Sequence, residues 1–345
     1  MNAKELRNIL QGLQLSELRK NKWIDEFGNI KDIMSIVHKE YRIIAIGSKL
    51  LQIEKTLTFF DFLLIYLQQM ISTEWIKNER GNRSNHPLIL WLDATDSKLE
   101  EQDKRNSEYF IVDPNDKIYA VLNLAYDLYT IDHNHKLQTD IIKRMKNIDQ
   151  FYGARYELFV ASICVRSGFN IEYENESDKS KRHVEFIGIH KSTGDKIGFE
   201  AKYKMRNELG ENPNILDEVK IGNIARLINN AVEKNPGLSE IIFIELNLPS
   251  SQAKRIMEGG DHFHSLISHT KQIKKSVDEK DLFNIVYFTN ITELFSLDDN
   301  KVTRKPFALM QALNPKYVLA NNDFIRDSLS KYLFQYGRIP KNFQN

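Results

Sequence analysis

The feature that most constrains the fold is a pair of alternating segments within residues 182–204 (RHVEFIGIHKSTGDKIGFEAKYK). Residues 183–189 and 197–203 are strand candidates in which Val184, Phe186 and Gly188, and then Ile197, Phe199 and Ala201, recur with the two-residue period of a β-strand. The stretch between them, residues 190–195, is turn-like and contains Gly194, which can take positive φ. The pattern predicts an antiparallel β-hairpin.

A turn centred between Ser192 and Thr193 decides which residues lie opposite each other on the two strands. One face becomes apolar, through the pairs Val184 with Ala201, Phe186 with Phe199, and Gly188 with Ile197. The other face carries Glu185 opposite Glu200, with Lys202 two residues further along.

Carboxylates that face each other on a sheet repel, so Glu185 and Glu200 need compensation. A divalent cation provides it, because hard cations prefer carboxylate oxygens. Lys202 would then lie beside the ion and its bound water. This is the set of groups needed for metal-assisted phosphodiester hydrolysis, in which the ion lowers the pKa of a water and the lysine stabilises charge in the transition state. The alternative is an exposed, charged sheet face without chemistry.

The hairpin resembles the PD-(D/E)XK nuclease superfamily, which includes type II restriction enzymes and archaeal Holliday-junction resolvases. In that pattern an acidic residue ends one strand and an acidic-x-Lys triplet follows on the next. Glu185 matches the first acid, and Glu200-Ala201-Lys202 matches the triplet. The resemblance implies that Mg²⁺ or Mn²⁺ is bound by Glu185, Glu200 and the Ala201 carbonyl, and that Lys202 is catalytic.

The resemblance covers about residues 150–290, under half of the chain. A narrower likeness, through GARYELFVASICVRSGF, HVEF and FEAK, points to uncharacterised bacterial members of the superfamily. The chain departs from the usual pattern at two positions, with Glu185 in place of Asp and Val184 in place of Pro. The longer Glu side chain moves the metal-binding oxygens by about one methylene.

Glu157 lies in a predicted helix, on the same face as Val160, Ala161 and Cys164. A carboxylate on an apolar stripe needs a partner. The resemblance implies that an acid from this helix reaches the metal site, directly or through water. The alternative is a boundary glutamate paired with a nearby arginine, Arg155 or Arg166.

Basic residues gather around the proposed site, and phosphate backbones are bound by such patches. The candidates for nucleic-acid binding are Lys181, Arg182, Lys204, Arg206 and Arg226. An ordinary solvated hairpin tip, and for Arg226 the polar outer face of a packed helix, would look the same. The formal net charge is +1, so any nucleic-acid contact must come from such a local patch.

The 345 residues fit about two domains, and 41% apolar residues can build a sizeable core. The single cysteine, Cys164, favours a reducing, cytoplasmic setting. The most apolar stretch, residues 57–67, is too short to span a bilayer and is expected to be a buried helix, so no membrane contact is predicted. Neither histidine cluster, His133 with His135 or the group near His264, has a zinc-site pattern.

The predicted fold class is α/β (α+β), a mixed-sheet restriction-endonuclease-like core with a mainly helical N-terminal domain. The predicted divisions are residues 1–148 for the helical domain, 149–295 for the nuclease domain, and 296–345 for a C-terminal helical extension packing on the core. Hydrophobic periodicity and turn residues predict helices at 153–166, 215–234 and 323–336, and strands at 87–92, 169–173, 183–189, 197–203, 240–246 and 284–288.

The sequence therefore predicts a Mg²⁺- or Mn²⁺-dependent nuclease that hydrolyses phosphodiester bonds, with DNA favoured over RNA and an endonuclease as the favoured form. Family analogy alone suggests bacterial defence against phage. The N-terminal domain would serve as a sensor or specificity module, or would bind a protein partner or a second copy of the chain. The alternative function is a catalytically inactive nuclease-fold module that binds nucleic acid or a partner protein.

Overall fold

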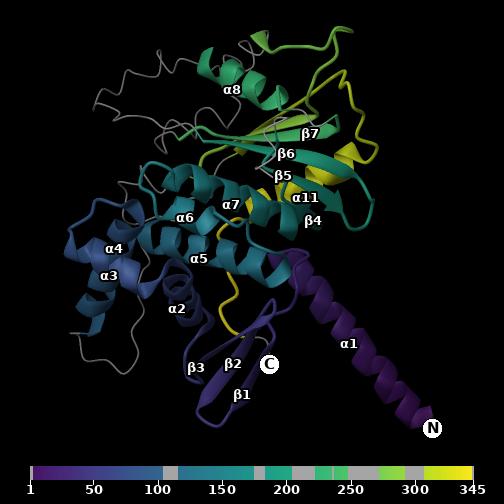
Figure 1. The fold of residues 1–345 in the computed structure, drawn as a ribbon. Coiled ribbons are helices and arrows are strands. Elements are labelled where there is room, and N and C mark those ends of the chain that lie inside the picture. The colour runs from purple at the N-terminus through teal and green to yellow at the C-terminus, as the bar shows by residue number, and fades with distance from the viewer. Residues whose placement is uncertain are drawn as a thin grey trace.

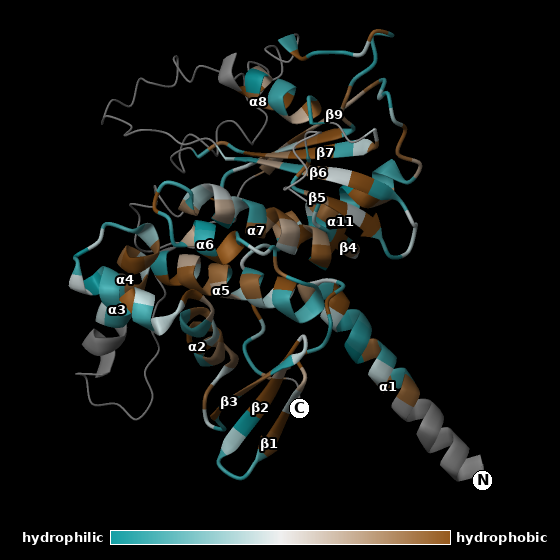
Figure 2. Ribbon diagram, in the orientation of Figure 1, coloured by the Kyte–Doolittle hydropathy of each residue, from teal (hydrophilic) through white to brown (hydrophobic). Residues whose placement is uncertain are grey.

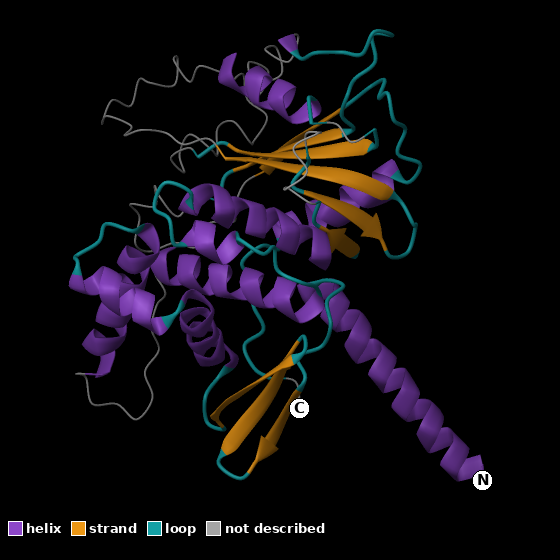
Figure 3. Cartoon of the chain, in the orientation of Figure 1, coloured by secondary structure: helices purple, strands orange, loops and turns teal. Residues whose placement is uncertain are grey.

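The structure is a computed structural model. It describes residues 3–103, 116–174, 183–203, 222–234, 237–247, 272–291 and 307–343. The chain forms a mixed α/β structure in which a six-stranded sheet lies beside a layer of helices, with a small second sheet beyond them (Figures 1 and 3).

The N-terminal part combines helices with a three-stranded antiparallel sheet. Its helices are α1 (Ala3–Phe27), α2 (Phe59–Ile71), α3 (Thr73–Gly81), α4 (Pro87–Asp103), α5 (Asp116–Asn134) and α6 (Ile141–Met145), and its strands are β1 (Ser35–His38), β2 (Tyr41–Ile46) and β3 (Lys49–Glu54). Helix α1 extends away from the rest of the chain (Figure 1). The prediction of a mainly helical region missed this small sheet, because β1 is short and largely exposed and so has no clear apolar alternation.

The strand predicted at residues 87–92 is wrong, since these residues begin helix α4. Pro87 is the first residue of that helix, where a missing backbone N–H costs nothing. Leu88, Ile89 and Leu92 are buried, which makes the run apolar enough to imitate a strand. A short apolar run cannot be assigned to a helix or a strand by periodicity alone.

The large sheet follows helix α7 (Phe151–Arg166) and has the order β4-β5-β6-β7-β8-β9. Its strands are β4 (Phe169–Glu172), β5 (Phe186–His190), β6 (Lys196–Tyr203), β7 (Ser239–Glu245), β8 (Ile285–Thr289) and β9 (Phe307–Gln311). Strands β6, β7 and β8 run parallel to one another, and the remaining neighbours are antiparallel. The mixed sheet agrees with the predicted α/β class.

The register of the central hairpin, β5 with β6, is the predicted one. Phe186 lies opposite Phe199, and Gly188 lies opposite Ile197. In the turn, the His190 backbone N–H donates to the Asp195 carbonyl at 2.9 Å, and Gly194 has a φ of +76°. A glycine adopts this left-handed conformation without steric cost.

Each face of the sheet packs against a different helix. Helix α7 covers one face, where Phe199, Phe243 and Tyr287 join the main hydrophobic core. Helix α8 (Gly222–Val232) covers the other face, where a smaller cluster includes Ile242 and Ile244. Figure 2 shows the apolar residues of the strands enclosed between these helices. We call these two surfaces the α7 face and the α8 face.

The main core continues across the boundary predicted at residue 148, since it joins side chains of α2, α4 and α5 to those of α7 and the sheet. The C-terminal segment supplies the edge strand β9, which was not predicted, and helix α11 (Asn322–Phe334), which contacts α7 and matches the predicted terminal helix. Among the described helices, none has the length and apolar character needed to cross a membrane.

Candidate active site

Strand β6 separates its charged and apolar side chains between the two faces of the sheet. Phe199 and Ala201 belong to the main core on the α7 face, so the intervening Glu200 and the following Lys202 project to the α8 face. The Glu200 side chain is fully buried, and the Lys202 side chain is 19% exposed. The Lys202 ammonium forms an ion pair with Oε1 of Glu200.

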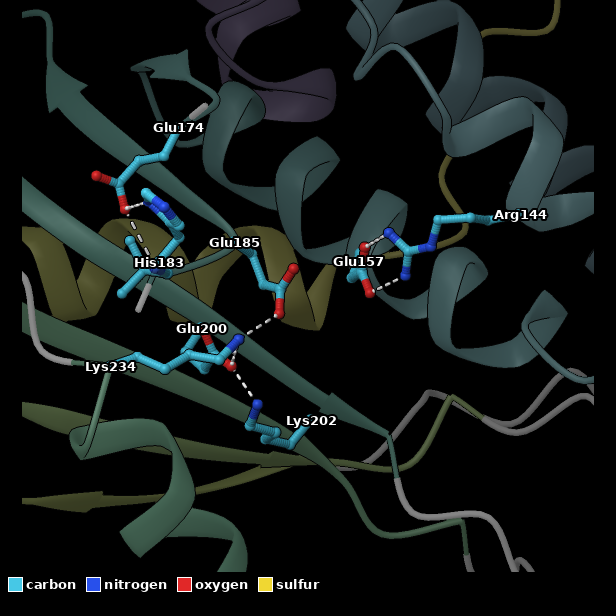
Figure 4. A network of polar contacts seen from close by, with 9 residues as sticks. Arg144, Glu157, Glu174, His183, Glu185, Glu200, Lys202 and Lys234 are labelled. Carbon is cyan, nitrogen blue, oxygen red and sulfur yellow. Dashed lines mark hydrogen bonds and ion pairs between the residues drawn. The ribbon is translucent and has the colours of Figure 1, made fainter. Parts of the chain in front are cut away.

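Glu185 lies immediately before β5, and its backbone N–H donates to the Phe199 carbonyl at 3.1 Å. The preceding residues are held by Glu174, whose carboxylate accepts a hydrogen bond from the Val184 N–H at 3.2 Å and lies 3.5 Å from the His183 ring (Figure 4). These contacts extend the hairpin beyond Phe186 and Phe199, its last paired residues. They bring the Glu185 carboxylate to the same side as Glu200.

Lys234, two residues beyond α8, joins the two acids. Its ammonium lies 2.8 Å from Oε1 of Glu200 and 3.3 Å from Oε1 of Glu185 (Figure 4). The structure thus brings together the predicted Glu185, Glu200 and Lys202 and adds a second lysine. Sequence reasoning placed Lys234 only at the end of a predicted helix, because nothing local indicates that this end lies over β6.

The electrostatics of the site follow from its burial. Burial, and then the charge of Glu185, raise the pKa of Glu200 despite the opposing effect of Lys202 and Lys234. Burial alone lowers the pKa of Lys234, but the charges of Glu185 and Glu200 and its hydrogen bonds to them raise it above its ordinary value. The site is therefore a group of mutually dependent charges in a place with little access to water.

A third carboxyl, Glu240, adjoins the site on β7. It pairs with Gly198, two residues before Glu200, so its side chain also projects to the α8 face. Glu240 is fully buried, and within the described residues neither of its carboxyl oxygens has a hydrogen-bond partner. Burial, and then the charge of Glu200, raise its pKa to about 8. The sequence showed Glu240 only as the first residue of a buried strand.

Glu157 of α7 is held by Arg144 of α6. The Arg144 guanidinium contacts both carboxylate oxygens, with one N–O distance of 2.6 Å (Figure 4). The expected alternative partners are engaged elsewhere: Arg155 pairs with Asp127 at 2.9 Å, and Arg166 donates to the Phe27 carbonyl. Figure 4 shows the Arg144–Glu157 pair beside Glu185. The hydrogen bond to Glu157, and to a smaller extent the charge of Glu185, raise the pKa of Arg144.

Of the residues proposed to bind nucleic acid, Arg226 is exposed on α8. The other four, Lys181, Arg182, Lys204 and Arg206, lie outside the described residues.

The donor atoms of the site suit a hard divalent cation. Glu185 and Glu200 offer only carboxylate oxygens, and Oε2 of Glu200 is buried without a hydrogen-bond partner in the described part of the chain. Across those same residues, no three His, Cys, Asp or Glu side chains are grouped as a complete metal site. Mg²⁺ retains several waters and is commonly bound by one or two carboxylates, so the pair is a sufficient protein contribution.

The arrangement can bind a cation, place an ammonium beside it and attract an anionic substrate.

Comparison with known proteins adds no assignment: the chain matches no protein-family model, no curated protein and no solved structure.

Proposed function

We propose that the protein is a Mg²⁺- or Mn²⁺-dependent nuclease with a PD-(D/E)XK, restriction-endonuclease-like core, acting on DNA as an endonuclease. The observation that carries this proposal is the grouping of Glu185, Glu200 and Lys202 on one sheet face, where both carboxylates share a single ammonium from Lys234. The cost of burying two like charges together is offset by cations, and a divalent ion matches the pair best.

The roles of the residues follow from their positions. Glu185 and Glu200, with the Ala201 carbonyl, would hold the cation, which supplies Lewis-acid activation of the phosphate and of a water. Lys202 would orient the attacking water and stabilise charge on the phosphate oxygens. The ion pair with Glu200 keeps the Lys202 ammonium at the site before substrate binds. Glu157, whose carboxylate is oriented by Arg144, would reach the metal site from α7, directly or through water.

The proposed substrate is argued from basic residues, and the proposed setting from Cys164 and from family analogy. Arg226 is exposed on the outer side of α8, the helix that covers the α8 face, and would contact a phosphate backbone that passes over this helix. The four basic residues that flank the hairpin and the triplet, Lys181, Arg182, Lys204 and Arg206, would extend this contact. We place the activity in the cytoplasm, in keeping with one buried thiol at Cys164, and in defence against foreign DNA. The N-terminal helices and small sheet would act as a sensor, specificity or partner module, or as the contact between two copies of the chain.

The decisive experiment is incubation of the full chain with Mg²⁺ or Mn²⁺ and several nucleic acids: supercoiled, linear and single-stranded DNA, and RNA. We expect metal-dependent nicking or cutting of circular DNA. An exonuclease cannot cut this substrate, because it has no strand end. Glu200→Gln should remove both activity and tight Mn²⁺ binding in calorimetry. Absence of cleavage by the wild type in every combination would contradict the proposal.

One observation favours a second candidate function, a nuclease-fold module that binds nucleic acid without cutting. Lys202 and Lys234 already neutralise much of the negative charge of Glu185 and Glu200, so the folded site does not need a metal ion to offset their repulsion. A non-cutting module would bind DNA in gel-shift experiments with the same affinity in EDTA and in Mg²⁺. Metal binding that depends on Glu185 and Glu200 separates the enzyme from this candidate.

A further inference from the structure

Lys234 occupies the position between Glu185 and Glu200 that a shared cation would take. Its single ammonium contacts Oε1 of both acids, at 3.3 Å and 2.8 Å. We infer that Lys234 holds the carboxylate pair in the metal-free protein, is displaced when a divalent cation binds, and then contacts a phosphate of the substrate. This inference rests on the proposed function and adds to it a second phosphate-binding lysine whose availability depends on the metal.

Competition between the ammonium and a divalent cation follows from charge and ligand geometry. The Lys234 ammonium lies between Oε1 of Glu185 and Oε1 of Glu200, and a divalent ion bound by both carboxylates through these atoms would need the same position. At the same separation the divalent ion gains twice the attraction. A lysine and a metal ion that share these oxygens would lie too close together, because two positive charges repel without intervening water in a buried site. Among the described residues Lys202 pairs with Glu200 alone, so its ammonium does not fill the position between the two acids.

The backbone around Lys234 can stay in place while its side chain leaves. Its backbone N–H donates to the Ala231 carbonyl at 2.8 Å, which anchors the turn after α8. The neighbouring Glu233 is ion-paired with Lys274, on the outer side of the turn. The Lys234 side chain is 27% exposed, so its four-carbon stem can swing toward solvent without unpacking the core.

The released ammonium remains at the edge of the site. There it is within reach of any phosphate that the metal and Lys202 bind, and a compact, mobile ammonium is a general phosphate ligand. Binding of an anionic substrate should therefore gain one charge contact only after the metal has arrived. In the metal-free protein the same lysine is paired with the acids and contributes little to substrate binding.

The first test measures release in the wild type. The full chain is acetylated with a short pulse of an amine-reactive ester, with and without Mg²⁺, and lysine modification is quantified by peptide mass spectrometry. Release should raise the modification rate of Lys234 severalfold, because its amine leaves the two carboxylates and becomes more accessible to the reagent. Lys274, which pairs with Glu233 away from the site, should not change. An unchanged or lower Lys234 rate, when calorimetry shows bound Mg²⁺, would overturn the inference and leave the proposed function standing.

The second test compares DNA binding by the wild type and Lys234→Met, in EDTA and in Ca²⁺, which takes the same oxygen ligands as Mg²⁺. The probe is a short fluorescent DNA duplex, and circular dichroism checks that the variant is folded. We expect Lys234→Met to bind as the wild type does in EDTA, and to bind more weakly in Ca²⁺, with a salt slope reduced by about one. Lys274→Met is the matched control.

An equal loss of affinity in EDTA and Ca²⁺, or no loss in either, would overturn the inference. If calorimetry detects no divalent cation at Glu185 and Glu200 at all, both the inference and the proposed metal-dependent function fail. Metal binding without a change at Lys234 contradicts the inference alone.

Discussion

Arg144 and Glu157 form a two-point ion pair between α6 and α7, in which the guanidinium contacts both carboxylate oxygens. Both side chains are mostly buried, with 21% and 15% of their surface exposed. The pair thus fixes the direction of the one acid that α7 presents near the site.

We expect Arg144→Met and Glu157→Gln each to lower the free energy of unfolding by about 1–3 kcal/mol, because each leaves a partly buried group without its partner. The double variant should show a coupling energy of roughly 0.5–3 kcal/mol in urea unfolding. The exposed pair of Arg326 and Asp323 is the control and should couple by less than about 1 kcal/mol. Strict additivity of the two buried substitutions would contradict the prediction.

Lys202→Ala should reduce DNA cleavage on the order of a hundredfold or more, since it removes a preorganised charge at the reacting phosphate. It should also lower the free energy of unfolding by about 1–3 kcal/mol, because its mostly buried side chain pairs with a fully buried carboxylate that then keeps Lys234 as its partner. Single-turnover cleavage and thermal unfolding measure the two effects. Lys196→Ala, an exposed residue of the same strand, should leave both unchanged. Full cleavage by Lys202→Ala would rule out the proposed role.

Glu240 should make stability depend on pH in metal-free buffer. Its pKa in the folded protein is about 8, against an ordinary value of 4.5, so the folded state holds a proton that the unfolded state releases between these values. The stabilisation is complete below the lower value and is lost as pH rises to the upper one. The wild type should therefore lose up to about 1.4 kcal/mol per pH unit relative to Glu240→Gln between pH 5 and 8.

Urea unfolding of the wild type and Glu240→Gln across this pH range measures the difference. Glu54→Gln, on the exposed side of β3, serves as the control and should follow the wild type. A constant difference between the wild type and Glu240→Gln at every pH would show that Glu240 has the same protonation in the folded and unfolded states.

Gly188 should tolerate no side chain. A Cβ built there would lie 2.5 Å from the Phe199 ring and 3.0 Å from the Phe169 ring, and both rings are fully buried. Gly188→Ala should therefore destabilise the protein by roughly 1–3 kcal/mol through overpacking. Gly153→Ala is the opposite case, because it meets nothing within 4 Å and lies in α7, and should stabilise by about 0.5–1 kcal/mol. Thermal unfolding that ranks the two variants in the reverse order would contradict this packing.

Much of the large sheet was predictable from local pattern. The period-2 alternation around Gly194 set the hairpin register, and a shift of one residue would have moved the apolar side chains of one strand from the α7 face to the α8 face. The same register put Glu185, Glu200 and Lys202 on one face. Helix α7 and strands β4, β7 and β8 also appeared within a few residues of their predicted bounds. Helix α7 and β4 have a clear period, whereas β7 and β8 are short apolar runs rich in β-branched and aromatic residues.

Other elements have a weak local signal. The strands of the small sheet β1–β3 pair with their neighbours in sequence but are short and partly exposed, so their apolar alternation is incomplete. The edge strand β9 is also short and partly exposed, and it becomes a strand because β8 pairs with it. Residues 87–92 are helical because their apolar side chains pack against the helical layer rather than a sheet. Local preference does not decide such cases.

The candidate site divides in the same way. Glu185, Glu200 and Lys202 came from the alternation of one hairpin, which a strand encodes within a few residues. Lys234 and Glu240 joined them because β7 pairs in parallel with β6, and because α8 packs so that its end lies over Glu200. Parallel pairing and helix packing bring together segments that are separated by long connections, so the local sequence pattern does not predict these contacts. Side-chain alternation is a property of the backbone, whereas the meeting of these five ionisable groups is a property of the packed core.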